Sequence, residues 1–185
     1  MKLNLGCGSK ILEGYINVDK FQYYPVDVVH DLENFPWPWS DSEVEDIILS
    51  HVLEHIGQDP DIFNSIIKEL YRVCKNGAVI DIAVPHPRHD DFLADPTHVR
   101  PITILGLSLY DKELNEKWAA ERAANTPLAL IHGVNFKIVE SIYSIEPDIL
   151  EKYNTGIIDR DELDSLIKHQ VNIVKQISIK WKVIK

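Results

Sequence analysis

The chain begins with Lys2-Leu-Asn-Leu-Gly-Cys-Gly-Ser9, and Tyr15-Ile-Asn-Val-Asp19 follows it closely. This pattern predicts a buried strand that runs into a glycine turn, then a second short strand that ends in a carboxylate. Gly6 and Gly8 allow a positive φ and a close approach of the backbone to a ligand. Asp19 can accept hydrogen bonds from two ribose hydroxyls. A strand pair of this kind is typical of a site for an adenosine-containing ligand.

The glycine turn fits the dinucleotide-binding fingerprint only in part. That fingerprint, G-x-G-x-x-G, requires a third glycine at the position where this chain has Ile11. It also places the acidic residue about 20 positions after the first glycine, whereas Asp19 comes sooner. A nucleotide-dependent oxidoreductase of the NAD(P) type is therefore disfavoured and kept as an alternative.

Two further strand-then-acid segments follow, Val26-Asp-Val-Val-His-Asp-Leu32 and Glu45-Asp-Ile-Ile-Leu-Ser-His-Val-Leu-Glu-His-Ile56. Together with the first pair, they resemble the small-molecule group of class I S-adenosylmethionine-dependent methyltransferases over residues 2–85. The resemblance implies an enzyme of that class, with S-adenosylmethionine as cofactor. It also implies an α/β fold with a Rossmann-like, seven-stranded, mostly parallel sheet, the strand order 3-2-1-4-5-7-6 and an antiparallel C-terminal strand.

The resemblance also suggests how the cofactor is held. The backbone of the glycine turn lies against the methionine part, Asp19 binds the ribose, and Asp31 with Leu32 meets the adenine. Ser50 and His51 end a strand at the crevice where ligands of doubly wound folds bind. The expected cofactor-binding residues are therefore Gly6, Cys7, Gly8, Asp19, Asp31, Leu32, Ser50 and His51.

The remaining pattern alternates strands and helices. Asp59 before Pro60 predicts a helix start, with the helix stopping at Asn76-Gly77. A second helix is expected from Asp159, with Glu162 returning a capping contact. The strict alternation over Ile177–Val183 predicts an antiparallel strand, with residues 136–145 as its partner. Only six residues separate Gly8 from Tyr15, too few for a helical crossover, so the first helix is expected to be reduced.

The segment Pro85–Pro101 contains three histidines and three aspartates. Within it, Asp95-Pro-Thr-His-Val-Arg100 resembles the D-P-T-H stretch of methyltransferases that act on glycans and other hydroxyl-bearing substrates. This implies that His98 acts as a general base oriented by Asp95 or another carboxylate, with His86 and His51 as the next candidates. The same residues could instead bind zinc or manganese, or form a purely structural loop. No recognised ligand spacing is present, so no metal site is predicted.

A single methyltransferase domain is expected over residues 1–185, with a substrate cap over residues 86–133. The expected reaction is O-methylation of a small-molecule or glycan hydroxyl. A non-catalytic module that only binds the adenosyl ligand stays open as an alternative. Trp37 and Trp39 are expected in the core or at a dimer contact rather than beside the adenine.

Composition limits the partners. The formal net charge is −10, and no Lys/Arg-rich run occurs, so nucleic acid is not an expected partner. No segment approaches the length of a membrane helix, so a membrane is not expected either. The start of the chain lacks the apolar core of a signal peptide, which predicts a cytoplasmic protein. Two cysteines give neither a disulfide framework nor a metal site. The oligomeric state is left open, with a homodimer as one option.

Overall fold

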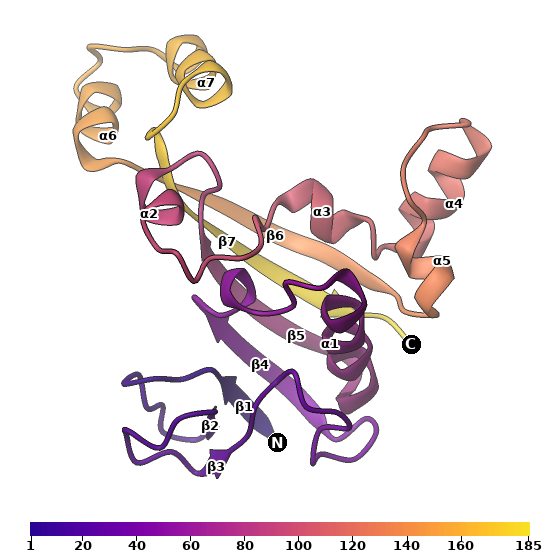
Figure 1. Cartoon of the computed structure of the whole chain (residues 1–185). Helices are drawn as coiled ribbons and strands as arrows, with labels where there is room; N and C mark the ends of the chain where they lie inside the picture. The colour runs from indigo at the N-terminus through magenta and orange to yellow at the C-terminus, as the bar shows by residue number, and fades with distance from the viewer.

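The computed structural model describes residues 1–185. Its centre is one seven-stranded sheet with the order β3-β2-β1-β4-β5-β7-β6 (Figure 1). Only β7 is antiparallel to its neighbours. The predicted strand order and the antiparallel C-terminal strand are therefore confirmed. The strands are β1 (Lys2–Leu5), β2 (Ile16–Asp19), β3 (Val28–Val29), β4 (Val44–Ser50), β5 (Cys74–Pro85), β6 (Phe136–Ile145) and β7 (Val174–Val183).

Helix α1 (Pro60–Val73) covers one face of this sheet. Its predicted start is confirmed, because the Asp59 side chain accepts a hydrogen bond from the backbone N–H of Asp61 at 2.7 Å. Its predicted stop at Asn76-Gly77 is wrong. The backbone leaves the helix at Cys74, which pairs with Val44 and opens β5. Residues 74–77, which the Asn76-Gly77 pattern assigned to the end of the helix, therefore belong to strand β5.

No helix stands between β1 and β2 or between β2 and β4, so the predicted loss of the first helix is confirmed. Within β4, Ile47 and Leu49 join the hydrophobic core. Their neighbours Ile48 and Ser50 instead line an open groove, together with Asp81 and residues of β7. One face of the sheet is therefore covered by helices, and much of the other face is open.

The remaining helices are short and lie mostly at the two ends of the sheet. They are α2 (Asp90–Leu93), α3 (Ile104–Ser108), α4 (Lys112–Ala120), α5 (Leu128–His132), α6 (Pro147–Asn154) and α7 (Arg160–His169), with a 3₁₀ turn, η1 (Leu53–His55), after β4. The predicted capping box of α7 is present, since Asp159 and Glu162 exchange hydrogen bonds of 2.9 Å. None of the helices combines the length and the apolar character needed to cross a membrane.

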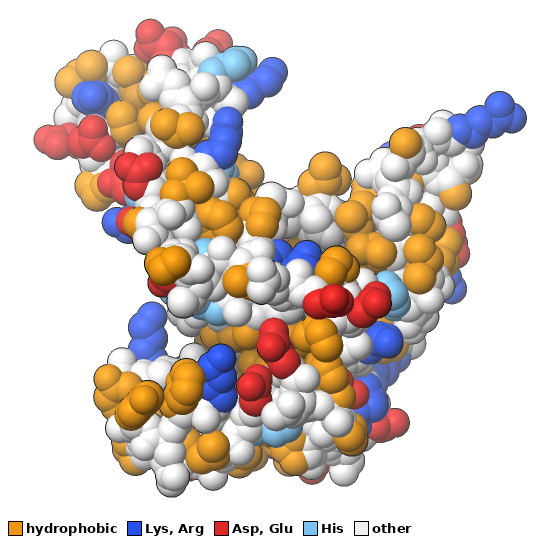
Figure 2. Space-filling model, in the orientation of Figure 1, with side chains coloured by type: hydrophobic (Ala, Val, Ile, Leu, Met, Phe, Trp, Pro, Cys, Tyr) orange, Lys and Arg blue, Asp and Glu red, His pale blue; other side chains and the backbone are white.

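Two arms project from the sheet with open space between them (Figure 2). Helices α6 and α7 connect β6 to β7 at the carboxyl end of β5, where Pro85 pairs with Gln176. Helices α4 and α5 precede β6 at the other end, where Phe136 pairs with Val183. The segment expected to form a substrate cap, residues 86–133, is thus divided between the two ends of the sheet.

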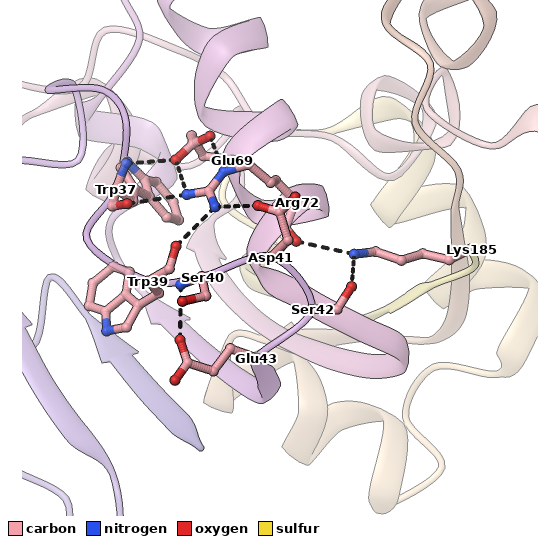
Figure 3. A network of polar contacts seen from close by, with 9 residues as sticks. All are labelled: Trp37, Trp39, Ser40, Asp41, Ser42, Glu43, Glu69, Arg72 and Lys185. Carbon is pink, nitrogen blue, oxygen red and sulfur yellow. Dashed lines mark hydrogen bonds and ion pairs between the residues drawn. The ribbon is translucent and has the colours of Figure 1, made fainter.

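The loop before β4 is fastened to α1 by one arginine (Figure 3). Arg72 donates hydrogen bonds to the backbone carbonyls of Trp39 at 2.9 Å and Trp37 at 3.2 Å. It also pairs with Glu69 and Asp41 at 2.7 Å, and Glu69 accepts the N–H of Trp37 at 2.6 Å. Both indole rings are buried in the core. Arg72 and Glu69 thereby hold the loop on α1, with its two tryptophans in the core.

Replacing Arg72 by alanine is expected to lower the free energy of unfolding by about 2–3 kcal/mol, because Glu69 and two carbonyls lose their donor. The hydrogen bond from Arg72 lowers the pKa of Glu69. This stabilisation is therefore present above the ordinary glutamate pKa of about 4.3. It is lost as pH falls through the lower pKa of the folded state. Urea denaturation of both proteins near pH 7 and near pH 3 measures the difference.

The matched control is Arg160→Ala, which removes a pair with Asp164 that is exposed on α7. Exposed pairs contribute little, so the control should unfold like the unmodified protein. Equal urea midpoints for Arg72→Ala and the unmodified protein near pH 7 would contradict the assigned role of Arg72.

Candidate functional site

A cavity of about 390 Å³ opens at the carboxyl ends of β1, β2 and β4. This edge of an open parallel sheet is where doubly wound folds bind their ligands. The volume lies within the ordinary range of small-molecule pockets. Its lining consists of Gly6, Asp19, Lys20, Phe21, His30, Asp31, Leu32, His51, Val52, His55, Ile56 and Thr97.

The glycine turn and the acid at the end of β2 form one locked unit. Gly6 and Gly8 have positive φ values of 63° and 49°. The turn brings the N–H of Gly8 to Oδ2 of Asp19 at 2.9 Å, while Oδ1 accepts the N–H of Phe21 at 2.9 Å. A carboxylate oxygen can accept more than one hydrogen bond. Asp19 is therefore oriented by the backbone and keeps acceptor capacity toward the cavity.

The second acid is positioned from the neighbouring strand. Oδ1 of Asp31 accepts the N–H of Glu33 at 3.0 Å. The indole N–H of Trp37 donates to the carbonyl of Leu32 at 3.0 Å. The buried tryptophan loop thus holds the Asp31-Leu32 pair in place against the cavity.

His51 follows β4 and has a φ of 58°, which is uncommon for a residue with a side chain. Such strain is often found at functional sites. Its Nδ1 lies 3.3 Å from Oε1 of Glu54, and its Nε2 lies 3.1 Å from Oε1 of Gln176. Contact with the Glu54 carboxylate raises the pKa of His51, against the opposing effect of burial. The imidazole thus lies at the cavity wall between the Glu54 carboxylate, which it contacts, and the Gln176 amide, to which it is hydrogen-bonded.

The loop after α2 docks on the turn after β4. The backbone N–H groups of Val99 and Arg100 both donate to the carbonyl of Glu54, at 2.8 and 3.2 Å. Nδ1 of His55 lies 2.9 Å from Oγ1 of Thr97. These contacts join the H-V-L-E-H-I and D-P-T-H-V-R stretches into one wall of the cavity.

Five of the eight predicted cofactor-binding residues line the cavity, namely Gly6, Asp19, Asp31, Leu32 and His51. Cys7 is buried in the glycine turn, and Gly8 holds Asp19 without lining the cavity. Ser50 is not brought to the cavity, because its side chain is directed to the open groove on the other face of the sheet.

Of the three candidate catalytic histidines, only His51 lines the cavity. His98 stacks on Phe92, and its Nδ1 lies 2.8 Å from the Phe92 carbonyl. His86 packs edge-on against Tyr143, outside the cavity lining.

Sequence analysis missed seven of the lining residues: Lys20, Phe21, His30, Val52, His55, Ile56 and Thr97. Six of them lay in or beside segments that the sequence singled out. Lys20 and Phe21 follow Asp19, His30 precedes Asp31, and the H-V-L-E-H-I stretch contains Val52, His55 and Ile56. Thr97 belongs to the D-P-T-H stretch, where the sequence pointed to His98 instead, and it reaches the cavity through the docking of its loop.

The sequence matches no protein-family model and no curated protein. Solved structures do match across nearly the whole chain. A SAM-dependent methyltransferase from Archaeoglobus fulgidus is 20% identical, with 98% of this chain and 85% of that chain covered and a TM-score of 0.61. One from Methanosarcina mazei is 15% identical, with 99% and 92% covered and a TM-score of 0.56. This chain has the class I methyltransferase fold.

The same methyltransferase fold also carries other chemistry. The [4+2]-cyclase SpnF is 13% identical, with 99% of this chain and 74% of that chain covered and a TM-score of 0.53. Fold alone therefore does not define the reaction, which depends on the residues of the cavity.

Gly6→Ala is expected to destabilise the protein more than Gly14→Ala. Both glycines have a positive φ, which costs an alanine roughly 1–2 kcal/mol. Only at Gly6 would a Cβ meet a neighbour, at 2.6 Å from Cγ2 of the buried Val52, and such overpacking adds about 1–3 kcal/mol. Urea denaturation measures both losses. In a Val52→Ala background the loss at Gly6 should shrink to that at Gly14, and an unchanged gap would refute the contact.

Proposed function

We propose that this protein is an S-adenosylmethionine-dependent methyltransferase that binds its cofactor in the cavity beside the glycine turn. The proposal rests on one observation. The glycine turn and two carboxylates, Asp19 and Asp31, which lie at the ends of consecutive strands, line the same cavity. The methionine part would lie along Gly6, and the ribose hydroxyls would donate to Asp19. Binding of S-adenosylhomocysteine, measured by calorimetry against NAD as the comparison ligand, tests the proposal.

Other lining residues support placing the adenine beyond the ribose, away from Gly6. Phe21 follows Asp19 closely and is 53% exposed, so its ring face is available for stacking. Leu32 and Ile56 provide apolar contacts, while Asp31 can accept a hydrogen bond from the exocyclic amine of adenine. An adenosyl group would thus find an aromatic face, apolar contacts and a carboxylate in one cavity.

The two alternatives fare differently. An oxidoreductase of the dinucleotide-binding kind would have the strand order 3-2-1-4-5-6, whereas β7 here is inserted antiparallel between β5 and β6. This disfavours the NAD(P) alternative. A module that binds the cofactor without turnover would have the same cavity, so only an assay of methyl transfer separates it from an enzyme.

For the acceptor we propose a hydroxyl of a small molecule or glycan. The D-P-T-H resemblance supports this class, and Thr97 of that stretch lines the cavity. The net charge of −10 argues against a nucleic-acid acceptor. Formation of S-adenosylhomocysteine against a panel of phenols, sugars and amines tests the acceptor class, because turnover with amines alone would exclude O-methylation.

Asp19→Ala is expected to lower the affinity for S-adenosylhomocysteine at least tenfold. Two ribose hydrogen bonds to a charged acceptor are lost, each contributing about 1.5–3 kcal/mol. Calorimetric titration measures the change, and a thermal melt checks that the variant folds. Asp148→Ala, an exposed carboxylate on α6, is the matched control and should bind like the unmodified protein. An unchanged dissociation constant for a folded Asp19→Ala would exclude the ribose role.

His51→Ala is expected to lower methyl transfer roughly 100-fold, a larger loss than its effect on the affinity for S-adenosylhomocysteine. The reason is its position, since it is the one candidate catalytic histidine that lines the cavity. Single-turnover assays with an acceptor found in the panel measure the rate. His86→Ala, outside the cavity lining, serves as the control. Full activity of His51→Ala would exclude His51 as the general base.

A further inference from the structure

The fully buried carboxylate of Glu54 lies next to two histidines. Glu54 is 0% exposed, and neither of its side-chain oxygens accepts a hydrogen bond. One ligand atom from each of Glu54, His55 and His98 lies within 4.8 Å of the others. A buried carboxylate is costly unless a cation or hydrogen-bond donors compensate it. His51 approaches Oε1 only, at 3.3 Å, which leaves Oε2 without any partner.

The hydrogen bonds around the two histidines prepare them as ligands. Nδ1 of His98 lies 2.8 Å from the carbonyl of Phe92, which can only accept, so Nδ1 carries the proton. Thr97 donates its hydroxyl proton to Asp95 at 2.6 Å, so its oxygen accepts from Nδ1 of His55 at 2.9 Å. In both rings the lone pair is then on Nε2. Metal-binding histidines are commonly oriented in this way, with the other nitrogen donating to a carbonyl or an oxygen.

We propose that Glu54, His55 and His98 form a site for a divalent transition metal ion of the zinc class at the rim of the cavity. Two imidazoles and one carboxylate suit zinc and its neighbours, whereas magnesium and calcium prefer oxygen ligands alone. Three protein ligands leave a coordination position open, and His55 itself lines the cavity. The open position would therefore be accessible to a ligand bound there.

This set differs from the metal-binding alternative that the sequence offered. That alternative drew only on the histidines and aspartates of the Pro85–Pro101 segment. Here two ligands come from the turn after β4, and only His98 comes from that segment. Backbone hydrogen bonds from Val99 and Arg100 to the Glu54 carbonyl hold the two segments together.

The test measures metal binding directly, without cofactor or acceptor, so its outcome is independent of the proposed methyl transfer. The full-length protein is freed of metal with a chelator and titrated with Zn²⁺ by calorimetry. Co²⁺ is then added as a spectroscopic substitute, and its visible absorption reports the ligand geometry. The expected result is one ion per chain, with Co²⁺ absorption typical of a low-coordinate site and displaced by Zn²⁺.

Glu54→Gln keeps the shape of the side chain and removes its charge, and His98→Ala removes one ligand. Each is expected to lower the Zn²⁺ affinity by roughly 100-fold or more, since even the loss of a group that only orients a ligand costs about 10–100-fold. Thr97→Val, which removes the hydroxyl that orients His55, should cost about tenfold. His169→Gln, an exposed histidine on α7, is the matched control and should leave the affinity unchanged.

Melting curves check that the variants fold, and Thr97→Val keeps the test valid if the buried substitutions do not. The proposal is overturned if the unmodified protein binds no Zn²⁺. It is equally overturned if folded Glu54→Gln and His98→Ala bind as tightly as the His169→Gln control.

Discussion

The carbonyl of Glu54 accepts two backbone hydrogen bonds, from Val99 and Arg100, and the candidate site depends on this contact. It fixes the loop after α2 against the turn after β4. Arg100 strengthens the contact, because its guanidinium donates to the Gly57 carbonyl at 3.0 Å and lies 4.2 Å from the centre of the Phe63 ring. The cavity acquires its second wall in this way, and the Glu54 side chain is excluded from water.

Side-chain hydrogen bonds replace the missing helix between β1 and β2. Where the methyltransferase fold usually places a first helix, this chain has a loop between β1 and β2. Asparagine side chains of these two strands form hydrogen bonds with the backbone of the loop. Asn17 accepts the N–H of Leu12 at 2.8 Å, and Asn4 donates to the carbonyl of Lys10 at 2.7 Å. Buried asparagines thus take over the ordering that a packed helix would supply. The cost is an open sheet face with a polar groove.

Two aromatic rings stay exposed on the outer side of the cavity. Phe21, which lines the cavity, and Tyr23 have ring centroids 5.6 Å apart, and no helix packs over them. The inner side is instead built from strand ends, from the docked loop, and from Leu32, whose carbonyl accepts the indole N–H of the buried Trp37. The cavity therefore combines a packed inner wall, where group transfer requires precise positioning, with an exposed outer side.

Local patterns determined much of this protein from sequence alone. The strand order followed from the methyltransferase resemblance, and the Asp59 cap, the α7 capping box and the alternation of β7 were predicted because each depends on neighbouring residues. Tertiary structure decided the direction of individual side chains. Ser50 and His51 were expected together, yet adjacent residues at a strand end point to opposite faces, so only His51 reaches the cavity. The burial of Glu54 was equally hidden, because it results from contacts with a loop more than 40 positions away in the chain.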